Sequence, residues 1–195
     1  DLSAFDSLAV GPGIGIDNDD WQKSKDYLMA FGGLLILDAD ALNRISESKL
    51  GSNFFLERKF KTWITPHSKE FGRLFPNIKS KTNVGLARDA AKEFNISILL
   101  KGANSIVADN KKVWQLFGTD SQTARAGLGD LLSGFVAGSS AIDLTLCRNI
   151  STDFFAKYVL LHSFAASKCK SGSNASAIGD ELTKLMRNIK TRQIS

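Results

Sequence analysis

The chain has 195 residues, enough for one domain with a sizeable core, and a formal net charge of +5. Its basic residues are scattered, so we expect neither a nucleic acid nor a membrane surface as a partner. We recognise no signal peptide and no apolar run long enough to span a bilayer. Two well-separated cysteines, Cys147 and Cys169, form neither a disulfide framework nor a zinc site, and a cytoplasmic location is expected.

Short apolar runs alternate with helical patterns along the chain. Strands are predicted where a run is apolar throughout, at residues 7–10, 33–37, 61–65 and 97–100. Helices are predicted at 17–29, after a cap at Asp38 or Asp40, after an N-cap at Ser68, and at 82–94, 130–142, 151–169 and 175–189. Residues 104–108 and 112–116 are typical of a hairpin that turns at Asp109 and Asn110. Residues 48–60 have no clear pattern, and 190–195 are expected to be a frayed tail.

This alternation predicts an α/β fold, with a mostly parallel central sheet covered by helices on both faces. We expect residues 1–195 to belong to one domain. Ligands of such sheets bind at the carboxyl ends of the strands. Polar or glycine-rich turns follow the predicted strands at that end, at residues 11–15, 38–43, 66–70 and 101–103. The sequence therefore predicts a binding site on this rim of the sheet.

The stretch Gly127-Leu128-Gly129-Asp130 precedes an apolar helical run. A helix that starts here points its free N–H groups and its positive dipole end at the loop, which suits a phosphate group. Asp130 would then have a catalytic role, such as taking a proton from an attacking hydroxyl. Alternatively, the glycines form a tight turn and Asp130 only caps the helix. The stretch alone does not decide between these interpretations.

Other polar residues also allow two interpretations. Lys101, at a strand end, could supply a point charge to phosphate or simply be solvated. His67 could be hydrogen-bonded locally at a helix start. Asp38 and Asp40 are interpreted as caps and scaffolding rather than metal ligands, and His162, on an amphipathic helix, as structural.

Several motifs together resemble the NAD(P)H-hydrate dehydratases of the ribokinase-like superfamily. They occur in the family's order and span essentially the whole chain: Gly11-Pro12-Gly13-Ile14-Gly15, Asp38-Ala39-Asp40-Ala41-Leu42-Asn43, Thr65-Pro66-His67-x-x-Glu70-Phe71, Leu100-Lys101-Gly102-Ala103 and Gly127-Leu128-Gly129-Asp130. The motif with His67 is the more selective, because related thiazole and pyridoxal-type kinases usually carry Asn there. The resemblance implies a ribokinase-like three-layer sandwich.

The resemblance also implies a repair reaction. The family phosphorylates the ring hydroxyl of hydrated NADH or NADPH from ADP or ATP, and loss of phosphate then restores the ring double bond. It implies Mg²⁺ with the nucleotide, although we expect no dedicated protein ligands for the metal. Asp130 is the expected catalytic base. Nucleotide contacts are expected from Lys101, Gly102, Ala103, Asn104, Ser105, Gly127, Leu128 and Gly129, and substrate contacts from Gly13, Gly15, His67, Glu70, Arg73 and Asp130.

Two alternative functions are kept. A small-molecule kinase of the same superfamily, acting on a vitamin precursor or sugar alcohol, is compatible with the Gly-x-Gly-Asp loop. An inactive nucleotide-binding module is suggested by Leu128, because the family usually has Thr or Ser there; Arg125 and Ala126 also depart from the family's pattern.

The chain enters its first predicted strand within a few residues of Asp1. Family members carry an earlier segment of the domain, and many bacterial members also carry a fused epimerase domain. We therefore expect that an N-terminal part is missing here, which would leave an exposed sheet edge. A homo-oligomer is expected from the resemblance alone.

Overall fold

The computed structural model describes residues 2–15, 18–117, 127–147, 149–170 and 172–192. In these segments six strands form one sheet, in which the spatial order of the strands is their order in the chain. Four strands are parallel: β1 (Ser7–Val10), β2 (Leu34–Leu37), β3 (Thr62–Ile64) and β4 (Ser97–Leu100). Strands β5 (Ser105–Ala108) and β6 (Val113–Leu116) follow as an antiparallel hairpin. The predicted strands and hairpin are thus confirmed.

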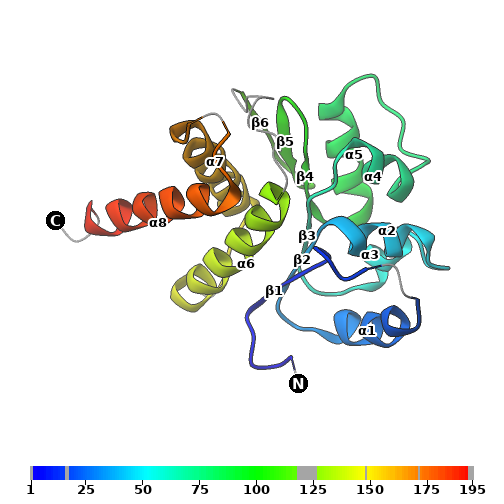
Figure 1. Cartoon of the computed structure of the whole chain (residues 1–195). Helices are drawn as coiled ribbons and strands as arrows, with labels where there is room; N and C mark the ends of the chain where they lie inside the picture. The colour runs from blue at the N-terminus through cyan, green and yellow to red at the C-terminus, as the bar shows by residue number, and fades with distance from the viewer. Residues whose placement is uncertain (1, 16–17, 118–126, 148, 171, 193–195) are drawn as a thin grey trace.

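Helices cover both faces of the sheet (Figure 1). On one face lie α1 (Asn18–Ala30), α2 (Ala39–Glu47), α3 (Asn53–Glu57), α4 (Ser68–Leu74) and α5 (Asn83–Phe94). On the other lie α6 (Leu128–Cys147) and α7 (Thr152–Lys168), with α8 (Ala175–Arg192) packed against them. This is the three-layer α/β arrangement that the sequence predicts.

Strand β2 explains why the strands carry no polar alternation. Leu35 and Leu37 pack into the core beneath α1–α5, whereas Leu34 and Ile36 pack against α6 and α7. All four side chains are buried, because a parallel strand between two helical layers is covered on both faces. On β3, Trp63 stacks on Phe155 of α7, with ring centroids 4.6 Å apart, and this contact fixes α7 to the sheet.

Several element boundaries differ from the predictions. Helix α3 lies within the stretch 48–60 that showed no pattern. Helix α6 begins at Leu128 and ends at Cys147, so Asp130 lies inside its first turn rather than ahead of it. Helix α8 continues to Arg192, beyond the expected end at 189.

Helix α6 also corrects the expectation about apolar length. In the described part of the chain, Leu128–Cys147 is the one helix long and apolar enough to cross a membrane by length and composition. In this structure it packs across β1 and β2 as part of the covering layer. Core helices of water-soluble domains meet the same criteria, but only 28% of the apolar window of α6 is buried, so this packing accounts for part of its composition.

Candidate functional site

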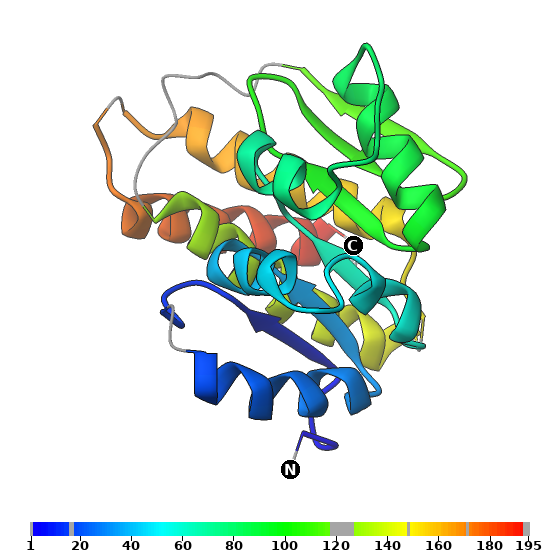
Figure 2. The same cartoon turned by 90° about the vertical axis from the view of Figure 1, so that its right-hand side faces the viewer.

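The carboxyl ends of β1, β2, β3 and β4 lie at one edge of the sheet. In Figure 2 this edge is on the left, and the turn after β1 and the first turn of α6 both lie on that side. Lys101, which follows β4, is bonded through its backbone N–H to the carbonyl of Pro66, and it forms an isolated parallel bridge with His67. Parallel pairing therefore gathers the predicted turns on one rim.

A buried carboxylate lies at the centre of this rim. Asp38 directly follows β2, and its residue surface is 1% exposed. Its Oδ1 accepts hydrogen bonds from Lys101 Nζ at 2.7 Å and from the backbone N–H of Ala39 at 2.8 Å. Its Oδ2 accepts one from Ser133 Oγ of α6 at 2.8 Å. Asp38 caps α2, as expected, and it also joins β4 and α6 to the end of β2.

The first turn of α6 lies over the Asp38–Lys101 pair. A side-chain carbon added at Gly129 would lie 3.6 Å from Asp38 Oδ2 and 3.8 Å from Lys101 Nζ. Gly127 has a φ of +81°, a conformation that favours glycine. Asp130 is exposed in the same turn. Three kinds of group thus lie close together: the free N–H groups at the start of α6, the Lys101 ammonium and the exposed Asp130 carboxylate. This arrangement suits phosphate binding next to a proton acceptor.

Leu128 has a packing role in this loop. Its partly buried side chain packs against the apolar cluster between α7 and α8, which contains Ala165, Ala166, Ile178 and Leu182. A leucine here anchors α6 to the helices behind it. The two other departures, Arg125 and Ala126, lie outside the described residues.

The turn after β1 is tied to helix α2. The backbone N–H of Gly15 donates to Asp40 Oδ2 at 3.1 Å, and Arg44 Nε donates to the carbonyl of Gly15 at 2.8 Å. A carbon added at Gly13 or Gly15 would meet no atom within 4 Å, so this backbone faces open space. That exposure leaves room for a ligand to approach the main chain.

His67 is the N-cap of α4, which corrects the prediction that Ser68 fills this position. Its Nδ1 accepts hydrogen bonds from the backbone N–H groups of Lys69 at 3.1 Å and Glu70 at 3.2 Å. In return, Glu70 Oε2 accepts the backbone N–H of His67 at 2.8 Å, which completes a capping box. Ser68 is the first helical residue. The local interpretation of His67 therefore describes its contacts, while its ring stays about half exposed at the rim.

The remaining predicted residues are less closely joined to the centre. Arg73 Nη1 donates to Asn43 Oδ1 at 2.6 Å, which links α4 to α2. The buried Ser105 directs its hydroxyl to the carbonyl of Gly102 at 3.3 Å, within its own turn. Gly102, Ala103 and Asn104 are exposed. Contacts of these residues with a nucleotide or substrate stay predictions.

Sequence reasoning interpreted Asp38 only as a cap or scaffold and did not find Ser133. The position of Asp38 next to a strand end was a signal, since buried carboxylates at strand ends seldom lack a partner. No local pattern pairs Asp38 with Ser133, which is 95 residues further along the chain.

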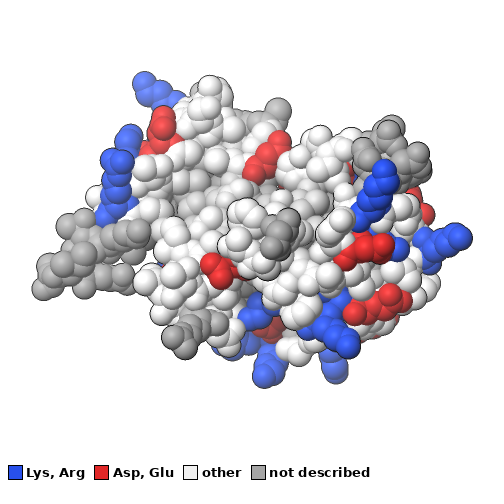
Figure 3. All heavy atoms as spheres, turned by 90° about the horizontal axis from the view of Figure 1, so that it is seen from below, with Lys and Arg blue, Asp and Glu red and all other residues white. Residues whose placement is uncertain are grey.

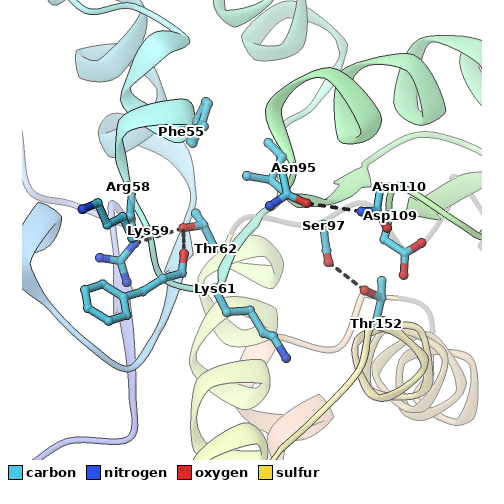
Figure 4. A pocket seen from close by; sticks show the side chains of 12 residues that line it. Phe55, Arg58, Lys59, Lys61, Thr62, Asn95, Ser97, Asp109, Asn110 and Thr152 are labelled. Carbon is cyan, nitrogen blue, oxygen red and sulfur yellow. Dashed lines mark hydrogen bonds between the residues drawn. The ribbon is translucent and has the colours of Figure 1, made fainter.

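A cavity of about 320 Å³ lies at the opposite, amino end of β3 and β4 (Figure 4). Its polar side chains bind one another: Asn110 donates to Asn95 at 3.3 Å, and the hydroxyls of Ser97 and Thr152 are 2.7 Å apart. Arg58 donates to Thr62 Oγ1 and to the carbonyls of Leu28 and Gly33, and burial lowers the pKa of Arg58 to about 10. These groups join neighbouring elements, so we assign the cavity a structural role.

The layers and strand order are those of the ribokinase-like α/β class, as two solved structures illustrate. A ribokinase-like superfamily protein from Enterococcus faecalis V583 superposes with a TM-score of 0.80 and 24% identity, covering 96% of this chain and 64% of that chain. The ADP/ATP-dependent NAD(P)H-hydrate dehydratase from Bacillus subtilis, co-crystallized with ATP and Mg²⁺, gives a TM-score of 0.72 and 23% identity, covering 94% and 64%. At these identities the likeness establishes the fold, and it confirms the predicted class.

Sequence comparison identifies the family. A family model described as NAD(P)H-hydrate dehydratase matches residues 1–190, and the chain belongs to this family. The bifunctional NAD(P)H-hydrate repair enzyme Nnr of Synechocystis sp. is 34% identical over 139 residues, which cover 71% of this chain and 26% of that protein. The Nnr protein of Gloeobacter violaceus is 37% identical over 155 residues, covering 76% and 28%. The chain thus matches little more than a quarter of the length of these relatives.

Proposed function

We propose that this chain carries the nucleotide site and the catalytic base of an ADP- or ATP-dependent NAD(P)H-hydrate dehydratase. The observation that carries the proposal is the first turn of α6 lying over the Asp38–Lys101 pair, with Asp130 exposed beside it. Family membership supplies the reaction, and this arrangement supplies the groups that phosphoryl transfer needs.

In the proposed reaction, the phosphate chain of the nucleotide binds at the N-terminus of α6, within reach of Lys101. Asp130 takes the proton of the ring hydroxyl as the hydroxyl oxygen attacks the terminal phosphorus. The bond from that phosphorus to the nucleotide breaks, and the shortened nucleotide leaves. The carbon–oxygen bond then breaks with electron donation from the ring nitrogen, phosphate departs, and loss of a proton from the neighbouring carbon restores the double bond.

The residues on the rim fit a Mg²⁺ ion that is held mainly by phosphates and water. The described residues contain no group of three or more His, Cys, Asp or Glu side chains that could enclose a metal. Asp38 already accepts three hydrogen bonds, and Asp40 holds the N–H of Gly15. When bound, Mg²⁺ would neutralise phosphate charge, and the protein would contribute the nearby ammonium and helix N-terminus.

We infer that a further part of the polypeptide, or a separate chain, covers the free edge of β1. Among the described strands β1 pairs only with β2, and its residues are half-buried. Figure 3 views the molecule from the side of β1, where the middle of the face carries few charged side chains. The matched E. faecalis and B. subtilis chains are longer, since 64% of each is covered. We also propose a homo-oligomer and a cytoplasmic location, the latter supported by the free thiols of Cys147 and Cys169.

The test is recovery of the reduced-nicotinamide absorbance from hydrated NADH or NADPH, with ADP or ATP, by the full-length polypeptide. Asp130→Asn should lower kcat by roughly 10²–10⁴-fold, the usual contribution of a general base, while ADP still binds. Asp89→Asn, on α5, is the matched control and should leave kcat unchanged.

Two outcomes would contradict the proposal: no recovery by the full-length protein, or unchanged turnover by Asp130→Asn. A stable phosphorylated product without recovery of the absorbance would indicate the small-molecule kinase instead. Tight ADP binding without any turnover would indicate an inactive module.

A further inference from the structure

We propose that Asp38 is a positioning residue that holds the ammonium of Lys101 beneath the first turn of α6, where a phosphate oxygen binds. The identity of the phosphate ligand rests on the proposed function. The arrangement of Asp38, Lys101 and Ser133 does not.

The contacts of Asp38 come from three separate parts of the fold. Lys101 follows β4, Ser133 lies on α6, and Ala39 opens α2, yet all three donate to the same carboxylate. The side chain of Asp38 is 2% exposed, whereas that of Lys101 is 26% exposed. The buried carboxylate therefore holds the ammonium from the protein interior, while about a quarter of the Lys101 side chain stays exposed.

The backbone of Asp38 is also held by hydrogen bonds on both sides. Its N–H donates to the carbonyl of Val10 at 3.1 Å, and its carbonyl accepts the N–H of Ala41 at 3.1 Å. Ala39 has a φ of +46°, an uncommon conformation for a residue with a side chain. Such strain persists only where surrounding contacts over-determine it, which is typical of sites that need an accurately placed group.

A cap alone would not require a carboxylate here. Asparagine caps helices as well as aspartate does, because its Oδ1 can accept the N–H of Ala39 equally well. An amide would, however, leave the Lys101 ammonium without a counter-charge. Because Ala39 and Lys101 both bond Oδ1, an amide that keeps the cap would direct its NH₂ group at Ser133. Asp38→Asn therefore separates the positioning role from the capping role.

The experiment uses the full-length polypeptide with Asp38→Asn, Lys101→Met and the double variant. Ser133→Ala keeps the ion pair and removes one hydrogen bond, and Asp89→Asn is the surface control. Two quantities are measured: kcat/KM for dehydration, and the rate at which an amine-acylating reagent labels Lys101, followed by peptide mass spectrometry. Labelling needs neither nucleotide nor hydrate.

If Asp38 acts through Lys101, Asp38→Asn speeds labelling of Lys101 and lowers kcat/KM by about 10²-fold, as expected for a misplaced group. Lys101→Met gives a similar loss, and the double variant loses no more than Lys101→Met alone, because residues that act as a unit are not additive. Ser133→Ala stays within about tenfold of wild type.

Unchanged labelling and turnover in Asp38→Asn would overturn the proposal, as would a double variant whose loss is the product of the single losses. If Asp38→Asn does not fold, the double variant, which has no unpaired charge, is compared with Lys101→Met. Equal kcat/KM values for the two variants support the proposal, and a lower value for the double variant contradicts it. If the wild-type protein has no dehydratase activity but Asp38→Asn still speeds labelling of Lys101, the positioning role is supported and the proposed function is refuted. If the wild-type protein is active but Asp38→Asn leaves labelling unchanged, the proposed function is supported and the positioning role is refuted.

Discussion

At the scale of single residues, Gly11 sets how closely β1 can approach the buried Asp38. Its φ is +135°, and a side-chain carbon added there would lie 1.7 Å from the carbonyl oxygen of Asp38. That distance is far inside van der Waals contact, and the other atom belongs to the backbone. The glycine is therefore required by the close approach of two strand ends.

Gly11→Ala should lower the free energy of unfolding by at least about 2 kcal/mol, through overpacking and backbone strain. Gly13→Ala is the matched control, because Gly13 also has a positive φ, of +69°, but open space around it. Gly13→Ala should lower the free energy of unfolding only by the cost of placing alanine at a positive φ, roughly 1–2 kcal/mol. Urea denaturation measures both, and equal losses would contradict the role of the contact.

His162 gives the fold a dependence on pH. It is buried on α7, its Nε2 has no hydrogen-bond partner among the described residues, and burial lowers its pKa from 6.5 to about 4. The unfolded chain takes up the proton at higher pH than the folded one. Stability is therefore full above about pH 6.5 and falls as the pH drops toward 4.

The loss across this window should be about 3 kcal/mol, since each unit of pKa difference is worth about 1.4 kcal/mol. His162→Leu removes the titrating group, so its unfolding free energy should fall less steeply over the same range. Denaturation curves at several pH values measure the two slopes. Parallel slopes would show that His162 does not contribute.

At the scale of elements, the start of α4 shows a residue in two possible roles. His67 forms a complete capping box with Glu70, and its ring is about half exposed on the rim next to Lys101. Capping explains the conformation of His67. It does not explain why histidine is used, because asparagine is a better cap.

His67→Asn should keep the cap and leave stability within about 0.5 kcal/mol of wild type, whereas His67→Ala should cost about 1 kcal/mol. If the ring also contacts the hydrate, both variants should raise KM for it while KM for ADP stays unchanged. Thermal denaturation and steady-state kinetics give the two readouts. Normal hydrate KM in His67→Asn would leave capping as the role of His67.

The elements also show how far sequence reasoning reaches. The strands and their shared rim could be predicted, because buried parallel strands are short apolar runs and their carboxyl ends meet at one edge. Helix α3 could not, since Ser52 makes no capping hydrogen bond with its side chain and the helix spans only Asn53–Glu57. The cap at His67 was missed because serine is a far commoner cap than histidine. Contacts between distant segments, such as Ser133 with Asp38, leave no local signal.

At the scale of the whole molecule, the free edge of β1 predicts the behaviour of the isolated chain. An open strand edge beside apolar side chains such as Phe5, which is 56% exposed, favours association. Residues 1–195 alone should therefore form concentration-dependent oligomers. If a further segment of the polypeptide covers this edge, as proposed, the full-length polypeptide should instead give one defined species. Sedimentation velocity over a concentration series checks this, and a monodisperse monomer of the isolated chain would contradict it.

The sequential order of the sheet has a consequence for folding. Each strand from β2 to β6 pairs with the strand that precedes it in the chain, so the sheet can grow stepwise during synthesis without inserting a strand between two others. Helix α6 crosses β1 and β2 from much later in the sequence, and it brings Gly129 and Asp130 to the rim. The sheet can therefore form before the site exists. Nucleotide that binds at the α6 turn would therefore stabilise the molecule only once α6 has packed on the sheet.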